Sequence, residues 1–368
     1  MSLEIIDKII LSLADKLDSR GLGDPYFKSP PYRIFPIKGE NFRPITEPTS
    51  RRKLAFIDGG SREIFGAPDF SIQINRVYFN VFNGGDAPQA SESGRCEYFS
   101  VTYAQPNGPS IDYETVHYPS SGETRIPLPD ETDLKFSSAD KTMSTAGQRA
   151  DISRVAGTSR MFAEWKCAKH VAEEKLGEGS IVVMDGNLRA WYTNEARYAQ
   201  SAYAAAEAKG AVVTGLSKTS RLLTTKSRSL LSSVEEFARK NVPHGTWYTP
   251  VAEVAAPYHN ATIFIVKLHP NADHIFRFEI VHDQYVNLKE AEVDDILSHL
   301  AQNSCDLAFP GYPYGLIDAD NFARVSEEEA NGYKLMFLSQ MTRNGRLDSF
   351  SSIRALDAHD ILNRLVGY

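Results

Sequence analysis

Two apolar segments of the sequence each run directly into an Asp-Gly pair. The segment "LAFIDGGS" reaches Asp58, and "IVVMDGNL" reaches Asp185. Asp-Gly is common in turns, so one copy on its own indicates only a turn. A carboxylate at the end of a buried strand is costly, however, unless a cation faces it. Two copies with a similar layout therefore direct attention to a shared cation.

The two aspartates predict a site for divalent cations. If their strands are parallel neighbours, both carboxylates emerge at the carboxyl edge of the sheet, where open α/β sheets bind ligands. Two carboxylates at that edge repel each other unless a cation bridges them. Because Mg²⁺ and Mn²⁺ prefer carboxylate oxygens, we predict that Asp58 and Asp185 hold metal.

Two further acids are candidates to complete the metal site. Glu164 lies in "MFAEWKCA", on or beside the apolar face of a predicted helix, and is the predicted third ligand. A surface glutamate is the alternative. Asp320 lies in "GYPYGLIDADNFARV", close to Asp318, and is the predicted late ligand. Its alternative is an acid near the start of a helix, stabilised by the helix dipole.

Carboxylates in the order strand, helix, strand, helix are typical of two-metal phosphoryl-transfer sites on a ribonuclease H-like core. Two ions about 3.5–4 Å apart activate water and stabilise the leaving oxygen. Lys218, in "TGLSKTS", follows the next predicted strand and would emerge at the same edge. We predict that it stabilises negative charge on the phosphate, with an ordinary loop lysine as the alternative.

A local run of basic residues points to a nucleic acid, although the net charge of −7 counts mildly against one. Residues 209–234 contain no acidic residue but five cations: Lys209, Lys218, Arg221, Lys226 and Arg228. We predict that the last four face a DNA strand, while a solvated basic helix face is the alternative. Tyr312 and Tyr314 could stack on bases, or could simply pack within a rigid turn.

The first half of the chain must supply the strand that leads to Asp58 and the helix that carries Glu164. Its elements are predicted from hydrophobic periodicity and from Gly and Pro punctuation. In order they are a helix at 3–18, an extended arm at 20–50, strands at 54–58, 70–82 and 95–105, a surface excursion at 105–147, and a helix at 148–176. The three strands suggest an antiparallel meander.

The second half begins with a strand–helix–strand unit, whose two strands we expect to be parallel. Its elements are a strand at 180–185, a helix at 194–208, a strand at 211–216, a helix at 229–240, strands at 246–254, 261–269 and 274–283, and helices at 289–302, 315–324, 326–342 and 353–366. The whole pattern predicts an α/β fold with a mixed sheet flanked by helices, an N-terminal helical arm and a helical C-terminal region.

Composition narrows the class of protein. The chain has 368 residues, of which 42% are hydrophobic and 24% charged, as in ordinary globular proteins. No apolar run approaches the roughly 18 residues of a membrane-spanning helix. The N-terminus lacks the features of a signal peptide, and three cysteines lie far apart with no C-x-x-C. These features predict a cytoplasmic protein without contact with a membrane.

Taken together, five segments resemble the NurA nuclease family of archaea and some bacteria. They are "AFIDGGS", the helix with Glu164, "VVMDGNL", "VTGLSKTS" and "GYPYGLIDADNFARVS", in an order and spacing that covers most of residues 50–340. The resemblance implies a ribonuclease H-like nuclease domain over residues 51–368, preceded by the N-terminal helix and arm at 1–50.

The resemblance also implies an activity and partners. It implies metal-dependent DNA cleavage, typically with two Mn²⁺ or Mg²⁺ ions, as a 5′-to-3′ exonuclease with some single-strand endonuclease activity. It implies a homodimer that works with the hexameric HerA translocase in the resection of DNA double-strand breaks. Carried over to this sequence, Asp58, Glu164 and Asp185 would be the core metal ligands, and Asp320 the late ligand.

Two other functions remain open from the sequence. Asp-Gly-Gly-Ser also resembles the first phosphate loop of actin-like and sugar-kinase ATPases, but "MDGNL" lacks the glycines of their second loop. The other alternative is a non-catalytic subunit that couples a motor to DNA, with the amphipathic helices at 3–18 and 353–366 as docking elements.

Overall fold

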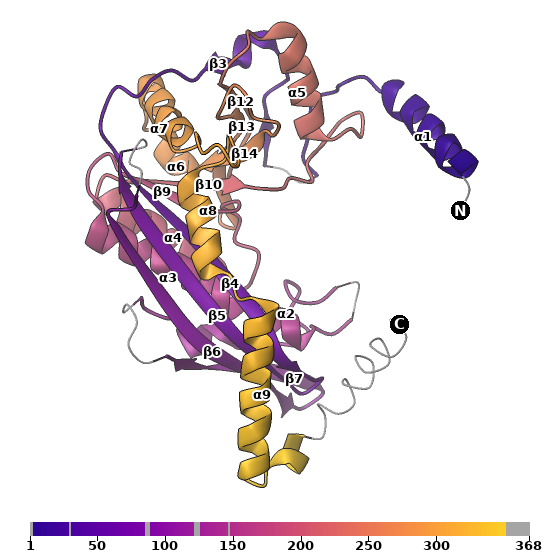
Figure 1. Cartoon of the computed structure of the whole chain (residues 1–368), viewed down its shortest axis with the longest axis vertical. Helices are drawn as coiled ribbons and strands as arrows, with labels where there is room; N and C mark the ends of the chain where they lie inside the picture. Colours follow the sequence, from indigo (N-terminus) through magenta and orange to yellow (C-terminus); the bar gives the residue numbers. More distant parts are fainter. Residues whose placement is uncertain (1–2, 29–30, 85–88, 121–125, 146–147, 351–368) are drawn as a thin grey trace.

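A computed structural model describes residues 3–28, 31–84, 89–120, 126–145 and 148–350 of the chain. One large, twisted mixed sheet forms its centre (Figure 1). Its long strands are β4 (Lys53–Gly66), β5 (Phe70–Asn83), β6 (Glu92–Asn107), β7 (Ser110–Pro119), β9 (Ile181–Asp185), β10 (Val212–Ser217), β12 (Trp247–Ala256), β13 (His259–Lys267) and β14 (Phe276–Ile280). Two-residue strands are β1 (Pro25–Tyr26), β2 (Arg33–Ile34), β3 (Arg43–Pro44), β8 (Phe136–Ser137) and β11 (Leu223–Thr224).

The order of the strands places three parallel neighbours in the middle of the sheet. The order is β2-β12-β13-β14-β10-β9-β4-β5-β6-β7-β8, with β3 also paired to β12. Strands β4, β9 and β10 are parallel, whereas their neighbours on both sides are antiparallel. The predicted mixed sheet, its parallel strand–helix–strand unit and the antiparallel meander are therefore confirmed.

The α-helices of the described residues are α1 (Leu3–Asp18), α2 (Ile152–Ala156), α3 (Thr158–Lys175), α4 (Glu195–Ala208), α5 (Leu230–Asn241), α6 (His282–Tyr285), α7 (Glu290–Gln302), α8 (Tyr314–Ala323) and α9 (Glu327–Arg343). Helices α3, α4, α7 and α8 cover the two faces of the parallel strands. Alternate residues of β4 face opposite layers: Ala55 and Ile57 pack with α3 and α4, and Leu54 and Phe56 pack with α7 and α8. This two-sided burial explains why β4 begins as a continuous apolar run.

Strand β4 does not end at Asp58, as the sequence had suggested. It continues through Gly59 and Gly60 to Gly66 and pairs with β5 over nearly its whole length. The two glycines are required because a Cβ on Gly59 would collide with Glu164, and one on Gly60 would collide with the carbonyl of Ala323. Here Asp-Gly marks a close approach of α3 and α8 to a strand. Asp185, in contrast, does end its strand.

Two other predicted segments differ from the structure. Much of the predicted surface excursion at 105–147 extends the sheet, since β7 pairs with β6 and with β8, and Leu134 and Phe136 are buried. The helix predicted at 148–176 is divided at Gly157 into α2 and α3. The polar and aromatic residues of β7 hid its strand character, because only one face of it packs on the core.

The N-terminal arm is partly built into the sheet. Strand β1 pairs with β11, and β2 and β3 pair with β12. Helix α1 projects away from the body of the molecule, and its apolar residues are exposed (Figure 1). The helix predicted at 353–366 lies outside the described residues. The division of the chain at residue 50 stays a prediction.

Candidate active site

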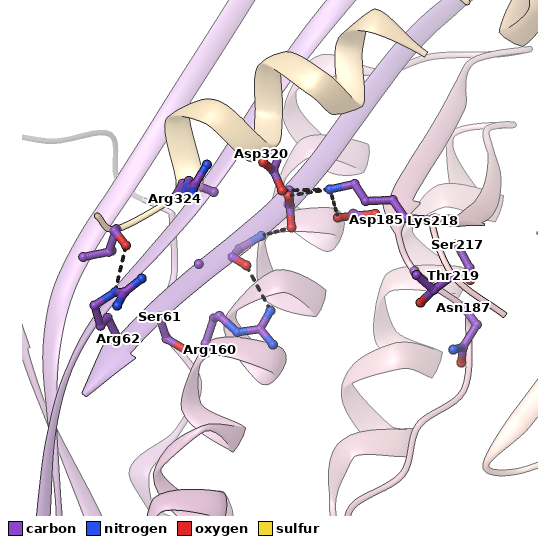
Figure 2. A pocket seen from close by; sticks show the side chains of 16 residues that line it. Ser61, Arg62, Arg160, Asp185, Asn187, Ser217, Lys218, Thr219, Asp320 and Arg324 are labelled. Carbon is purple, nitrogen blue, oxygen red and sulfur yellow. Dashed lines mark hydrogen bonds and ion pairs between the residues drawn. The ribbon is translucent and has the colours of Figure 1, made fainter. Parts of the chain in front are cut away.

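The carboxyl edge of the parallel strands brings three aspartates together. One carboxylate oxygen from each of Asp58, Asp185 and Asp320 lies within 4.8 Å of the other two. Asp58 comes from β4, Asp185 from the end of β9, and Asp320 from α8, which crosses the sheet above them (Figure 2). Acids from far apart in the sequence therefore form one cluster, which we call the aspartate cluster.

Strand register aligns the first two members of the aspartate cluster. Ile57 pairs with Met184 in the parallel β4–β9 ladder, so the next residue of each strand, Asp58 and Asp185, leaves the ladder at the same level. Asp185 in turn pairs with Leu216 of β10, two residues before Lys218. The side chains thus meet because the parallel pairing of the three strands stops at the same level, although β4 itself continues.

Contacts with β5 hold α8, and with it Asp320, over the sheet. The side-chain amide of Asn80 donates to the carbonyl of Gly315 at 2.9 Å and to the carboxylate of Asp318 at 2.8 Å. Gly315 lies directly against the ring of Phe56, where a Cβ would collide with it. Asp318 therefore anchors the helix, while Asp320, half a turn further on, reaches the cluster.

The Lys218 ammonium lies among the three carboxylates. Its Nζ is 2.8 Å from Asp320 Oδ1, 2.9 Å from Asp185 Oδ2 and 4.0 Å from Asp58 Oδ2 (Figure 2). Burial opposes its positive charge, but the surrounding carboxylates outweigh burial and raise the pKa of Lys218 above its usual range. The side chain is 39% exposed, so it stays accessible from the cleft.

The aspartate cluster carries more negative charge than Lys218 neutralises. Burial, followed by the charges of Asp185 and Glu164, raises the pKa of Asp58 far above that of an ordinary aspartate. Three convergent carboxylates with excess negative charge are the donor set that a hard divalent cation prefers. The residues present therefore fit Mg²⁺ or Mn²⁺.

Glu164 lies close to this cluster but outside it. Its side chain reaches the backbone of β4 at Gly59 from α3, and it forms an ion pair with Arg160. Arg160 also donates to the carbonyl of Gly59 at 3.1 Å. Burial raises the pKa of Glu164 to about 7, although Arg160 acts in the opposite direction. The predicted third ligand thus approaches from the other face of β4, whereas the predicted late ligand, Asp320, is a member of the cluster.

Tyr312 is placed to orient Asp185. Its hydroxyl donates to Asp185 Oδ1 at 3.2 Å, and its ring is buried against Phe276. The burial of the ring favours the packing alternative for Tyr312, and base stacking by this residue stays a prediction. Tyr314 is 37% exposed and packs edge-on against Phe82.

The basic run of the sequence lies largely outside the cleft. Of the four cations predicted to face DNA, only Lys218 lines it. Arg228 is paired with Glu236 at 2.9 Å. Lys226 lies against Gly23 of the arm, and Arg221 is exposed.

Three arginines that sequence reasoning missed line the cleft, whose volume is about 700 Å³: Arg62, Arg160 and Arg324. Arg62 lies four residues after Asp58 on the unrecognised continuation of β4, where alternation along a strand would have placed it on the same face. Its Nε donates to the carbonyl of Val325 at 3.1 Å, which fixes it beside the end of α8.

A buried carboxylate, also missed, secures the loop that follows Asp185. Glu279 on β14 accepts the backbone N–H of Leu188 at 2.9 Å and contacts His259 Nε2 at 3.1 Å. Burial disfavours its charge, but Arg277 and His259 outweigh burial and lower the pKa of Glu279 to about 2. Glu279 is fully buried within β14, and its sequence neighbourhood contains no motif that marks it as a functional acid.

The fold and the site define a class: an α/β protein with a cleft that holds an aspartate cluster at the carboxyl edge of its parallel strands. Comparison with models of known protein families shows which family this chain belongs to. The NurA domain profile matches residues 52–325, which is most of the chain. The chain therefore belongs to the NurA family and is a NurA family nuclease. No curated protein matches its sequence significantly.

Two solved structures show partial similarity to this chain. Ciona intestinalis Endonuclease V, in complex with a 24mer DNA containing an inosine followed by a ribo-adenosine, is 9% identical with a TM-score of 0.38, covering 87% of this chain and 96% of that chain. Aquifex aeolicus Argonaute is 11% identical with a TM-score of 0.30, covering 74% of this chain and 28% of that chain. These scores are too low to establish a shared fold.

In the part of the chain that the structure describes, we find no helix with the length and apolar character needed to cross a bilayer.

Proposed function

We propose that this protein is a divalent-metal-dependent DNA nuclease that hydrolyses phosphodiester bonds at the aspartate cluster. The observation that carries the proposal is the convergence of Asp58, Asp185 and Asp320 within 4.8 Å, around the ammonium of Lys218, in the cleft of a NurA family nuclease. The ribonuclease H-like character of the core belongs to the same proposal.

The aspartate cluster would hold Mn²⁺ or Mg²⁺, and Glu164, beside Asp58, would complete the shell of a second ion. Bound ions of this kind activate water and stabilise the leaving oxygen in phosphodiester hydrolysis. Tyr312 supports this role because its hydroxyl fixes the orientation of the Asp185 carboxylate. Asn80 supports it by holding α8, and therefore Asp320, in place.

The cations of the cleft would bind the DNA phosphates. Lys218 is accessible and already lies within hydrogen-bonding distance of two cluster carboxylates, so a phosphate bound there would meet its ammonium directly. A preorganised cation at that position stabilises charge that develops on the phosphate. Arg62 and Arg324, further along the cleft, would contact the flanking phosphates, and Arg221, Lys226 and Arg228 would steer the strand from outside.

The finer features of the proposal come from the family resemblance. They are 5′-to-3′ exonuclease action with single-strand endonuclease activity, a homodimer, a cytoplasmic location, and double-strand break resection with a HerA-type hexameric translocase. The exposed apolar residues of α1, Ile9 and Ile10 among them, offer a surface for a second copy or for that partner.

Digestion of end-labelled DNA tests the proposal. Purified protein is incubated with single-stranded and duplex DNA, labelled at either the 5′ or the 3′ end, in Mn²⁺, Mg²⁺ or chelator. We expect cleavage with metal and none in chelator, with mononucleotides released first from the 5′ label. Addition of a HerA-type translocase is expected to increase digestion of duplex ends. Cleavage that persists in chelator would contradict metal dependence.

A further inference from the structure

A pocket beside the aspartate cluster has a chemical character that metal binding leaves unexplained. Its volume is about 420 Å³, within the range of about 300–1,000 Å³ that small-molecule sites occupy. Lys218 and Asp320 form one rim, which is shared with the cleft that holds the aspartate cluster. The remaining lining is apolar or aromatic: Leu231, His274, Ile275, Phe276, Phe309, Tyr312 and Ile317.

The aromatic residues form a continuous path away from the lysine. Lys218 Nζ is 5.8 Å from the centroid of the Tyr312 ring, and that ring is 6.0 Å from the ring of Phe309. Phe309 in turn stacks on His274, with centroids 5.8 Å apart and an angle of 24° between the planes. The pocket therefore begins at the Lys218 ammonium, the cation proposed above to bind phosphate, and continues along the aromatic rings.

Phe309 is the member of this path that is open to a ligand. It is 41% exposed, whereas Phe276 and Tyr312 below it are buried. Phe309 lies in the segment that connects α7 to α8, and α8 carries Asp320. The same stretch of chain therefore places both the ring and the aspartate beside the pocket. A large exposed ring supported by buried aromatics is a typical stacking platform for an unpaired base.

We propose that this pocket binds the base of the nucleotide next to the scissile phosphate, stacked on Phe309. The proposal rests on the proposed nuclease function, because the phosphate at Lys218 is what brings a nucleotide to the rim. The lining is mostly carbon, so stacking would accept any of the bases. A paired base cannot enter such a pocket, so the preferred substrate is a single strand or a frayed end.

The first experiment measures single-turnover cleavage at one bond of a single-stranded oligonucleotide. The base next to that bond is either present or replaced by an abasic site, and the proteins are wild type, Phe309→Ala and the control Tyr118→Ala. Tyr118 is an exposed aromatic on β7, far from the cleft in the sheet order. His274→Ala serves as a second variant if Phe309→Ala does not fold.

We expect Phe309→Ala to slow cleavage of normal DNA by between about fivefold and about a hundredfold, the range for loss of one stacked base. The abasic site is expected to slow the wild type by a similar factor but to have little further effect in the variant, since both changes remove the same contact. Equal rates for Phe309→Ala and wild type, or an undiminished abasic effect in the variant, would overturn the proposal.

A binding measurement separates this proposal from the proposed function. Oligonucleotides carrying 2-aminopurine at one position at a time are bound in chelator and in Ca²⁺, and fluorescence quenching reports stacking. If the wild type binds but never cleaves DNA, the nuclease proposal fails, and quenching that Phe309→Ala removes still supports the pocket. If no position shows quenching, the pocket proposal is overturned. It is also overturned if Phe309→Ala cleaves normally but changes its oligomeric state, because that result would indicate that a second copy covers the ring.

Discussion

At the scale of single residues, the site depends on an imbalance of charge. Three carboxylates face one ammonium, and burial makes their mutual repulsion more costly than it would be in water. The fold tolerates this arrangement because strand register, Tyr312 and Asn80 hold the groups in place. Replacement of one of these ionisable carboxyl groups by a neutral amide should therefore stabilise the metal-free protein.

Asp58→Asn is expected to raise the melting temperature in chelator by about 1–2 °C, which corresponds to roughly 1 kcal/mol for a chain of this length. The amide keeps the shape of the side chain but removes the cost that burial, and then the charges of Asp185 and Glu164, impose on an ionisable group there. Thermal unfolding followed by circular dichroism measures the change. Asp318→Asn, which alters a carboxylate bonded to Asn80, is the control and should destabilise. A lower melting temperature for Asp58→Asn would contradict the charge imbalance.

Lys218→Ala is expected to reduce the rate of metal-dependent cleavage by about 10²–10³, the effect of removing one preorganised group that stabilises developing charge. Its ammonium is the cation closest to the carboxylates that would hold metal. Cleavage of a labelled single strand at saturating Mn²⁺ measures the change, with Lys209→Ala on the exposed end of α4 as the control. A loss of less than threefold would exclude a role for Lys218 at the phosphate.

The sequence could predict part of this site at the residue scale. Asp58, Asp185 and Lys218 were found because each follows a recognisable strand, and parallel strands meet at one edge. The sequence also identified Asp320, but no local pattern shows that α8 folds back over β4. For Glu164, the helical pattern predicted that the residue lies near the sheet, but it could not predict which face of β4 the side chain approaches. No pattern in the sequence predicted its ion pair with Arg160.

At the scale of elements, strand β4 and helix α8 determine the geometry of the cleft. Strand β4 passes between α3 and α8, and its two glycines leave room for both. A turn at Asp58 was the natural prediction from Asp-Gly-Gly, because glycine is common in turns and weakens strands. Long-range packing against two helices overrides that preference here, and no local pattern in the sequence reports it.

Gly60→Ala is expected to impair cleavage by about tenfold or more, because the new methyl group must displace the end of α8 at Ala323 and with it Asp320. Its matched control is Gly177→Ala, where a Cβ would meet no atom within 4 Å. Both variants are compared by cleavage rate and by Mn²⁺ affinity from calorimetric titration. Unchanged values for Gly60→Ala would show that α8 is not fixed against β4.

At the scale of the whole molecule, a buried polar network ties the arm to the sheet and to α7. Asp295 accepts hydrogen bonds from Thr49, Ser50 and Arg52, with Arg52 Nε at 2.6 Å. Burial disfavours its charge, but these donors outweigh burial and hold the pKa of Asp295 well below its usual range. The residues on either side of the expected division at residue 50 therefore both bond to α7, and the division itself stays a prediction.

Asp295→Asn is expected to lower the free energy of unfolding at pH 7 by about 3 kcal/mol, because Arg52 is left buried without its counter-charge. The folded pKa lies below the unfolded value of about 3.9, so this contribution exists above about pH 4 and is lost as the pH falls. Denaturant unfolding between pH 7 and pH 3 should show the difference from wild type shrinking. The exposed Glu178→Gln is the control, and a difference that grows toward low pH would contradict this assignment.

The central claim is that the aspartate cluster carries metal-dependent DNA cleavage. The most direct test compares wild type and Asp58→Asn for digestion of labelled single-stranded DNA in Mn²⁺, alongside binding of the same DNA. Our account predicts loss of nearly all turnover in the variant with DNA binding retained. Turnover close to that of the wild type would contradict the claim. DNA binding without any cleavage by the wild type would instead indicate a non-catalytic subunit that couples a motor to DNA.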